Sequence, residues 1–414
     1  HRSRLLPQHR QTNRPNSTIL TDWRKMVRNQ TSLQFDARYR GLRGLRLFSC
    51  SRRTAVAFLV SLLVVVWGCS SPKSYRTDFG QIVSDDQSVC TVTSGGALRC
   101  FQLDYASTPP DERDEDPVLL SVDHVGDVTS LKRDTDNLCF LGRKGDVRCL
   151  GPNDMGQISP NFDIRYFHQP TTIALPGPAS SIAVGRRHGC AIVDGSVHCW
   201  GNDAYGQASG VGREPELHVH YRYGLKATVR VNLPEGIKQV HASNETTCAR
   251  GDSGAVYCWG KNRFGEVGVP DGIDVESGQS VAKVPLPQPA VKLLDERRGK
   301  ACALLADASI HCWGSFQGSR KPIPTGPVAL KVSTRLQEIS GQMGMASDGK
   351  LVFIDFHTFD PRDGFIKTRL TPIDTFGKVK SYSGSYRGLQ CWVLVSGAAY
   401  CRDERGRTTQ IGQY

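Results

Sequence analysis

The chain has 414 residues and a formal net charge of +12, but residues 1–68 alone carry +11, from 13 Lys and Arg against Asp22 and Asp36. The rest of the chain is close to neutral, which excludes the broad positive field by which proteins attract nucleic acid. The 14 cysteines are too many for an ordinary cytosolic enzyme and favour an oxidising compartment.

An apolar run near the start has the features of a secretion signal. It follows the basic pair Arg52 and Arg53, and its 14 residues 55–68 would span about 21 Å as a helix, short of the roughly 30 Å of a bilayer core. We predict that residues 1–53 are a basic extension absent from the mature protein, and that 54–68 is the apolar region of a signal peptide.

The residues after this run resemble a bacterial lipobox. Val66 and Gly68 match that motif before Cys69, whereas Trp67 stands where a small or medium residue is usual. The resemblance implies a lipidated Cys69, a linker over 69–78 and attachment to the membrane through the lipid, and Ser70 suggests the outer membrane by analogy. The alternatives are a plain export signal or membrane anchor in which Cys69 is incidental, and a cytosolic chain.

Twelve further cysteines fall into six evenly spaced pairs. Five pairs are ten residues apart and one is nine. The pairs are Cys90 with Cys100, Cys139 with Cys149, Cys190 with Cys199, Cys248 with Cys258, Cys302 with Cys312, and Cys391 with Cys401. Met343 and Phe353, also ten apart, occupy the wide gap before the last pair and predict a seventh, cysteine-free copy. The mean period of about 50 residues is typical of a propeller or a solenoid.

Each copy is predicted to be a β-hairpin. The nine-residue spacing centres on Asp194-Gly195, which favours a two-residue type I′ turn. The ten-residue spacings centre on three-residue loops, whose last residue has a left-handed conformation. These last residues are Gly96, Gly145, Gly254, Ala308, Gly349 and Gly397. Both loop lengths place the two cysteines directly opposite each other, within the reach of a disulfide.

The second strand of the hairpin also repeats. The pairs Trp200-Gly201, Trp259-Gly260 and Trp313-Gly314 each follow a second cysteine, and Leu150-Gly151 is a weaker copy. The strand is apolar on both faces, which indicates a sheet packed between two neighbours. The blades of a propeller have that environment.

Three copies carry a recognisable signature: CAIVDGSVHCWGNDAYGQ (190–207), CARGDSGAVYCWGKNRFGE (248–266) and CALLADASIHCWG (302–314). They resemble the regulator of chromosome condensation repeat. The resemblance implies an all-β fold, a seven-bladed propeller over residues 79–414. A cysteine before the tryptophan departs from the usual Ser or Thr and is more similar to the secreted bacterial branch.

We expect the twelve paired cysteines to form six local disulfides. Zinc is the rival interpretation, but a structural zinc site uses closely spaced cysteines, as in Cys-x-x-Cys, and the chain has no such pair. Free cysteines that pack as small apolar side chains are a further alternative, because Met343 and Phe353 fill the same place by packing.

The sequence predicts a protein that is not an enzyme, with no catalytic residue, no metal and no cofactor. It contains no Gly-x-Ser-x-Gly, phosphate loop or His-Glu-x-x-His motif. The longest segment between copies, 208–230, contains the candidate partner-binding residues His218, His220, Tyr221, Arg222 and Tyr223. A metal site and a plain surface insertion are the alternatives for this segment.

The predicted function is protein binding by a monomer at the bacterial cell envelope, either as an outer-membrane lipoprotein or as a secreted protein. The partner is an unknown protein, and nucleic acid is not expected. The resemblance also implies two alternatives: a guanine-nucleotide exchange factor for a small GTPase if the chain is cytosolic, and an inhibitor of an enzyme such as a β-lactamase. A propeller enzyme would need convergent carboxylates or a metal on one rim.

Overall fold

All the secondary structure in the described part of the chain is β-strand. The computed structural model describes residues 79–84, 88–102, 118–121, 125–134, 137–211, 224–269, 281–294, 299–314, 326–360, 364–385, 389–403 and 405–411. These ranges contain no helix with the length and hydropathy of a membrane span. The predicted signal region and Cys69 lie outside them.

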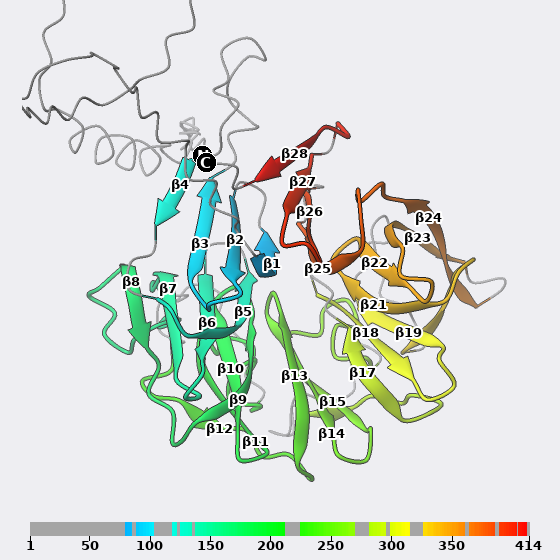
Figure 1. Ribbon diagram of the computed structural model, residues 1–414. Coiled ribbons are helices and arrows are strands. Elements are labelled where there is room, and N and C mark those ends of the chain that lie inside the picture. The colour runs from blue at the N-terminus through cyan, green and yellow to red at the C-terminus, as the bar shows by residue number, and fades with distance from the viewer. Residues whose placement is uncertain are drawn as a thin grey trace, which may run out of the picture. The chain divides into compact units, whose positions relative to one another are not determined.

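The strands follow one another as antiparallel four-stranded meanders, here called blades 1 to 7 (Figure 1). Blades 1 to 3 are β1 (Phe79–Ser84), β2 (Ser88–Thr93), β3 (Leu98–Gln102), β4 (Val118–Ser121); β5 (Val128–Asp134), β6 (Asn137–Gly142), β7 (Val147–Pro152), β8 (Tyr166–Thr172); and β9 (Ala179–Val184), β10 (His188–Val193), β11 (Ser196–Gly201), β12 (Val229–Arg230).

Blades 4 to 7 are β13 (Ile237–Ser243), β14 (Thr246–Gly251), β15 (Val256–Gly260), β16 (Ala282–Lys283); β17 (Ala290–Leu294), β18 (Lys300–Leu305), β19 (Ile310–Gly314), β20 (Val328–Lys331); β21 (Leu336–Ser340), β22 (Met343–Ala346), β23 (Leu351–Asp360), β24 (Phe365–Pro372); and β25 (Val379–Gly384), β26 (Gln390–Leu394), β27 (Ala399–Arg402), β28 (Thr408–Ile411). A short parallel pairing of β20 with β24 joins blades 5 and 6 into one eight-stranded sheet.

The first strands of the blades form a closed ring. Each of β1, β5, β9, β13, β17, β21 and β25 contacts the next, and β25 contacts β1. At this last junction the Ser84 N–H donates to Ser383 Oγ at 3.0 Å, and the Ile82 N–H donates to Ser381 Oγ at 3.1 Å. Every described blade consists of consecutive strands, so the ring closes by packing and a few hydrogen bonds between blades, without exchange of a strand.

The core lies between the blades. The buried apolar side chains form seven clusters, and each cluster joins two neighbouring blades, including blades 7 and 1 through Phe79, Phe101, Cys391 and Ile411. The strands are therefore apolar on both faces, as blades that stack face to face require. The middle strands β6 and β10 are buried at every position.

Six disulfides confirm the predicted cysteine pairing. Each links the second strand of a blade to the third, with a Cα–Cα distance of 4.0–4.1 Å between directly opposed residues. They join Cys90 to Cys100, Cys139 to Cys149, Cys190 to Cys199, Cys248 to Cys258, Cys302 to Cys312, and Cys391 to Cys401. The zinc and free-thiol alternatives for these twelve cysteines therefore do not apply.

The turns of the hairpins also have the predicted conformations. Asp194 and Gly195 have φ values of 47° and 71°, as a type I′ turn requires. Ala308 has a φ of 65° and so takes the same left-handed position as the glycines of the other three-residue loops.

Blade 6 offers a direct test of this register. Met343 and Phe353 are directly opposed, as the cysteines are in the other blades. We expect the double substitution Met343→Cys and Phe353→Cys to form a seventh disulfide, because opposed residues of this kind lie within disulfide reach. Peptide mass spectrometry without reductant should detect a cross-linked pair. Two free thiols in the folded variant would contradict the register.

Candidate functional site

The two rims of the propeller differ in what they carry. Because successive strands run in opposite directions, the turns between second and third strands and the links between blades share one rim, here called the hairpin rim. The opposite rim, here called the loop rim, carries the connections from first to second and from third to fourth strands. Four connections from a third strand to a fourth, between strand ends on the loop rim, contain the long segments 103–117, 212–223, 270–280 and 315–325, which lie outside the described residues.

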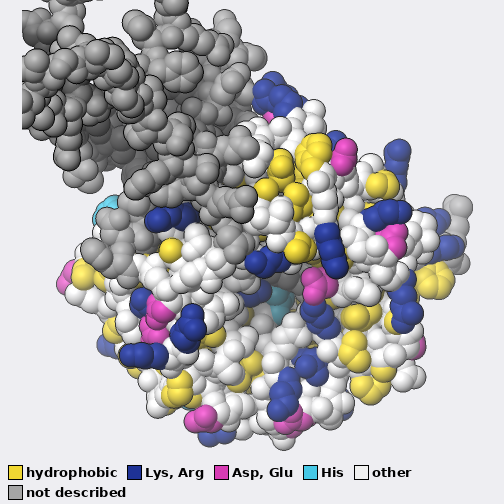
Figure 2. Space-filling model, viewed as in Figure 1, with side chains coloured by type: hydrophobic (Ala, Val, Ile, Leu, Met, Phe, Trp, Pro, Cys, Tyr) yellow, Lys and Arg dark blue, Asp and Glu magenta, His cyan; other side chains and the backbone are white. Residues whose placement is uncertain are grey.

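A channel passes between the first strands, and Figure 2 shows a face of the propeller that is hollowed near its centre, with Lys and Arg side chains around the hollow. The cavity has a volume of about 690 Å³ and is lined by residues from all seven first strands. Its charged lining residues are Lys132, Arg133, Asp134, Lys292, Glu338 and Lys380. Cavities of this size are typical of small-molecule sites.

Polar side chains from these strands tie neighbouring blades together around the channel. The third residue of each first strand is polar: Gln81, Ser130, Ser181, Gln239, Lys292, Glu338 and Ser381. Gln81 Oε1 accepts the Leu131 N–H at 2.7 Å, and Gln239 bonds both the N–H and the carbonyl of Leu293, at 2.8 and 2.7 Å. These bonds satisfy edge-strand groups that would otherwise be unpaired. Much of the polar lining is therefore structural.

Blade 2 places three charged residues at the channel mouth on the loop rim. Arg133 donates to Ser88 Oγ of blade 1 at 2.7 Å, and Asp134 Oδ2 accepts the Asn244 N–H of blade 4 at 3.2 Å. Lys132 lines the channel beside them. Arg133 contacts blade 1 and Asp134 contacts blade 4, so β5 connects blades on both sides of it at the channel mouth. In the described ranges, no group of three or more His, Cys, Asp and Glu is arranged to hold a metal.

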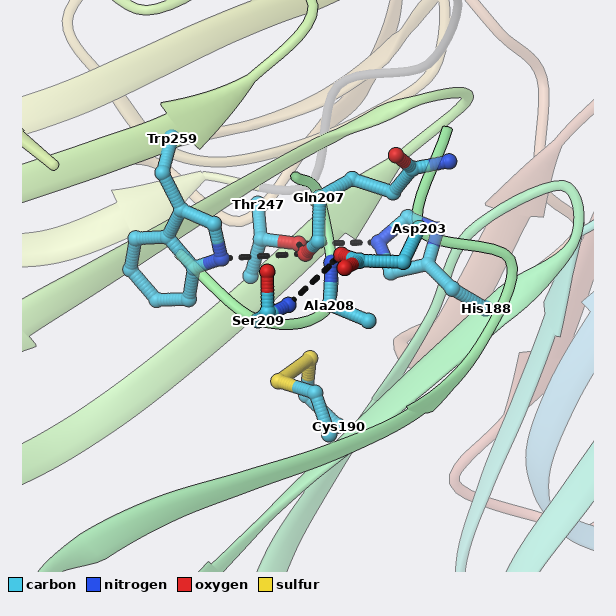
Figure 3. Close-up of a disulfide and its surroundings, with 9 residues drawn as sticks. His188, Cys190, Asp203, Gln207, Ala208, Ser209, Thr247 and Trp259 are labelled. Carbon is cyan, nitrogen blue, oxygen red and sulfur yellow. Dashed lines mark hydrogen bonds between the residues drawn. A yellow bond between two sulfur atoms is a disulfide. The ribbon is translucent and has the colours of Figure 1, made fainter. Parts of the chain in front are cut away.

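A repeated loop, here called the clasp, is present in three blades, and in two of them it accepts a hydrogen bond from the tryptophan of the next blade. In blade 3, Asp203 Oδ1 accepts the N–H groups of Ala208 and Ser209 at 3.0 and 2.7 Å, which folds the loop after Trp200-Gly201 (Figure 3). The Gln207 carbonyl then accepts the indole N–H of Trp259, in blade 4, at 2.9 Å. Trp259 is fully buried, so the clasp of blade 3 binds the largest core side chain of blade 4 and holds it in place.

The clasp recurs in blades 2 and 4. Asn153 and Asn262 occupy the position of Asp203: Asn153 Oδ1 accepts two loop N–H groups, and Asn262 Oδ1 accepts that of Val267. Trp200 donates to the Gln157 carbonyl at 2.8 Å, as Trp259 does to Gln207. Gly201, Gly260 and Gly314 after the tryptophans have φ values of 92°, 104° and 94°, which L side chains rarely adopt. The Trp-Gly pairs of the sequence thus form the joints between blades.

His188 is the most perturbed titratable group at the clasp (Figure 3). The Thr247 hydroxyl donates to the Gln207 carbonyl at 2.9 Å, so we assign the proton to His188 Nε2, which lies 2.8 Å from Thr247 Oγ1. His188 Nδ1 is buried and has no hydrogen-bond partner among the described residues. A second proton would have no acceptor there, and burial lowers the pKa of His188 to about 3.

We therefore expect the stability of the propeller to fall below about pH 6.5. An unfolded histidine binds a proton near pH 6.5, whereas folded His188 does so only near 3. Over that interval the unfolded state binds more protons, so stability is lost as the pH falls, by roughly 2 kcal/mol between pH 7 and pH 5. Urea unfolding at both values measures the loss. In the His188→Asn variant the loss should be smaller, and an equal loss would contradict this assignment.

The structure accounts for part of the predicted site. Trp200, Trp259 and Trp313 are buried in the junctions between blades, and Met343 is buried beside Phe353 in the junction of blades 6 and 7. The candidate partner-binding residues His218, His220, Tyr221, Arg222 and Tyr223 lie outside the described residues. The segment that contains them is part of the connection from β11 to β12, and the ends of these strands that it joins lie on the loop rim.

Sequence reasoning missed the clasp and the polar ring of the channel. Both left a signal in the repeats. The clasp is marked by Asn153, Asp203 and Asn262, each four residues before a Gln or Glu. The ring is marked by a polar residue at the third position of every first strand, directly after a β-bulge that redirects the side chain.

Comparison with known proteins places the repeat in a family. A family model, the regulator of chromosome condensation (RCC1) repeat, matches residues 237–266, which comprise β13 to β15 and the clasp loop that follows. Protein RCC1 of Candida albicans is 36% identical over 92 residues, 22% of this chain and 19% of that protein. The X-linked retinitis pigmentosa GTPase regulator homolog of Caenorhabditis elegans is 33% identical over 98 residues, 23% of this chain and 6% of that protein. The matches span less than a fifth of either relative.

Solved structures agree on the fold over most of the chain. Human WBSCR16 has a TM-score of 0.57 at 16% identity, covering 72% of this chain and 84% of its own. Prp20p of Saccharomyces cerevisiae has a TM-score of 0.54 at 17% identity, covering 79% of this chain and 83% of its own. The repeat signature, the clasps and the ring of blades thus agree with the comparisons: residues 237–266 match the regulator of chromosome condensation repeat, and the chain has the propeller fold of Prp20p.

Proposed function

We propose that this propeller is a non-catalytic protein-binding module that engages its partner through the loop rim. The observation that carries the proposal is the unequal length of the connections: four connections between strand ends on the loop rim contain segments of more than ten residues outside the repeat pattern. Long loops held by a rigid scaffold are the usual position of binding residues. Prp20p is described as binding Gsp1p and histones, which supports protein binding for a fold of this kind.

Site-specific photo-cross-linking tests this proposal. Val211, 46% exposed, is the last described residue before 212–223 on the loop rim, and exposed Lys144 lies in the blade 2 turn of the hairpin rim. A photoreactive phenylalanine at Val211, but not at Lys144, should yield a discrete cross-linked product in the native host. Replacement of 212–223, with its His218 and Tyr221, by a Gly-Ser linker should abolish that product. Equal products from both positions, or none from Val211, would overturn the proposal.

We further propose that the propeller is exported and displayed at the cell envelope through a lipidated Cys69. The apolar run 54–68, the lipobox-like residues before Cys69 and the six disulfides support an oxidising compartment. Mass spectrometry of the N-terminal peptide from the native host should find Cys69 acylated, with 1–68 removed. In the Cys69→Ser variant the protein should leave the membrane fraction. An intact N-terminus with unmodified Cys69 would contradict this proposal.

Guanine-nucleotide exchange is the second candidate, because the name of one relative describes a GTPase regulator homolog. It requires a small GTPase in the same compartment, and the disulfides favour a compartment outside the reducing cytosol. Release of a fluorescent guanine nucleotide from the host's small GTPases is the assay. Acceleration by the disulfide-bonded chain would favour exchange over the binding function.

A further inference from the structure

Blade 7 departs from the repeat on the hairpin rim, opposite the loops considered above. The links into blades 3, 4 and 5 begin with a residue whose N–H bonds to the preceding third strand: Ile173, Val231 and Val284. Ile373 makes the same bond at the link into blade 7. Three residues after this bonded residue, the links into blades 3, 4 and 5 have a proline: Pro176, Pro234 and Pro287. The link into blade 7 has Phe376 at the same position.

Phe376 is held in an unusual conformation and faces solvent. Its φ is 59°, which bulky L residues rarely adopt, and 60% of the residue is exposed. The turn is fixed by two short-range bonds: the Phe376 N–H donates to Asp374 Oδ1 at 3.2 Å, and Thr375 Oγ1 donates to the Gly377 carbonyl at 2.7 Å. Backbone strain that the fold maintains, at an exposed aromatic residue, points to a function.

An aromatic column supports the exposed ring from below. Phe376 packs on Tyr400 with ring centroids 5.3 Å apart, and Tyr400 stacks on the fully buried Trp392 at 6.0 Å. The Trp392 indole N–H donates to the Thr375 carbonyl at 3.2 Å, which ties the column to the turn. The positions that correspond to Trp392 in blades 3, 4 and 5 are Ala191, Ala249 and Ala303.

Blade 4 has a tyrosine at the same position, but its hydroxyl bonds to a polar side chain of the link. Its counterpart of Tyr400 is Tyr257, whose hydroxyl donates to the Glu235 carboxylate of the incoming link at 3.0 Å. There the tyrosine meets a polar group and the link carries Pro234. In blade 7 the link instead carries Phe376 and Gly377, so the tyrosine supports a protruding apolar ring.

The surroundings of Phe376 combine an exposed apolar residue with three exposed charges, two of them lysines. Val395 is 57% exposed, and its N–H donates to the Lys378 carbonyl at 2.8 Å, which sets the blade 7 turn beside the link. The exposed charges of the link and the start of β25 are Asp374, Lys378 and Lys380. One carboxylate oxygen of Asp374 is already occupied by the Phe376 N–H. We call Phe376, Lys378, Val395 and Tyr400 the Phe376 patch.

We propose that the Phe376 patch is a second docking surface, for a protein partner that presents an apolar socket bordered by Asp or Glu. The socket takes the Phe376 ring, whose pre-set position loses little conformational freedom on binding, and the acidic border faces Lys378. This surface is on the hairpin rim and is independent of the loop-rim proposal. It makes the propeller able to hold two proteins at once.

Selection from a displayed library of random 12-residue peptides tests the chemistry of this surface. The full chain with its six disulfides is the target, and the Phe376→Gly variant is the counter-target. Glycine adopts the φ of 59° without strain, so this variant should melt close to the wild type and keep its fold. Enriched peptides should combine apolar residues with Asp or Glu. They should bind at least about tenfold more weakly to Phe376→Gly and several-fold more weakly to Lys378→Glu.

Matched controls make each outcome decisive. Val291→Ser removes another exposed apolar residue, 50% exposed, from a first strand near the same rim and should leave peptide affinity unchanged. Failure to enrich peptides that depend on Phe376, or enrichment of basic peptides, would overturn the proposal. So would self-association of the wild type that Phe376→Gly abolishes, because the occupant would then be a second copy. Cross-linking from Val211 should persist in Phe376→Gly, which separates this test from that of the loop rim.

Discussion

Reduction of the six disulfides is expected to unfold the propeller at or near ambient temperature. In the chain-entropy model a cross-link over ten residues contributes about 2–3 kcal/mol, and this is an upper value for a hairpin that is local in any case. Even half of that, summed over six blades, is comparable to the total stability of about 5–15 kcal/mol that is typical of a folded domain. Thermal melts followed by circular dichroism, with and without prior reduction in denaturant, measure the effect.

The position of the disulfides predicts how reduction proceeds. The paired cysteines are buried, with exposures of 0–6%, so a reductant reaches them only when a blade junction opens. Reduction under native conditions should therefore be slow and should accelerate with mild denaturant. The Cys302→Ala and Cys312→Ala double variant, which removes the blade 5 pair alone, should show an intermediate melting temperature. An unchanged melting temperature after complete reduction would show that packing alone holds the blades, as it does at Met343 and Phe353.

Replacement of Trp259 by alanine should have the largest effect of any single substitution in the clasps. The indole is fully buried between blades 3 and 4, so its removal leaves a cavity and costs about 3–5 kcal/mol. The Gln207 carbonyl also loses one of its two donors, which loosens the loop that Asp203 holds. Chemical unfolding should show a lower denaturant midpoint. With an unchanged unfolding slope, this shift reports a loss of stability.

A matched pair of conservative variants isolates the hydrogen bond. Trp259 and Trp313 are equally buried and hold the same repeat position, but Trp313 Nε1 has no hydrogen-bond partner among the described residues. Trp→Phe at either position keeps most of the packing, so Trp259→Phe should be more destabilising than Trp313→Phe by about 1 kcal/mol. Equal losses at both positions would mean that the indole bond to Gln207 contributes nothing.

The repeating part of the fold could be predicted from the sequence because its signals are local. Cysteine spacing, the turn at Asp194-Gly195 and the left-handed loop ends depend on residues within one hairpin, and a period of about 50 residues predicts a propeller. The apolar pair Met343 and Phe353 was identified by the same spacing, and the structure places the two residues opposite each other. The cysteine pairing and the loop length each predict the strand register of the hairpin, and the two predictions agree.

The features that distinguish this propeller from a simple repeat depend on contacts between blades. The spacing of residues within one hairpin does not predict such contacts. The position of the proton on His188 depends on Thr247, 59 residues away, and Asp134 accepts the N–H of Asn244 at a separation of 110. Phe376 is visible in the sequence only after the links are aligned by the bonds of Ile173, Val231, Val284 and Ile373. The partner-binding residues proposed around Tyr221 remain a prediction, since they lie outside the described residues.

The closure of the ring without an exchanged strand means that no blade is required to come first in the chain. The seam between blades 7 and 1 is of the same kind as the other junctions: a cluster of apolar side chains and a few side-chain bonds, such as those of Ser84 and Ser383. The backbone N–H of Phe79 bonds to Gly397 across this seam, so the two ends of the ring are neighbours. Circularly permuted chains that begin at any blade should therefore fold into the same ring. Whole blades can also serve as units of duplication and loss, with the six disulfides travelling intact because each lies within one blade.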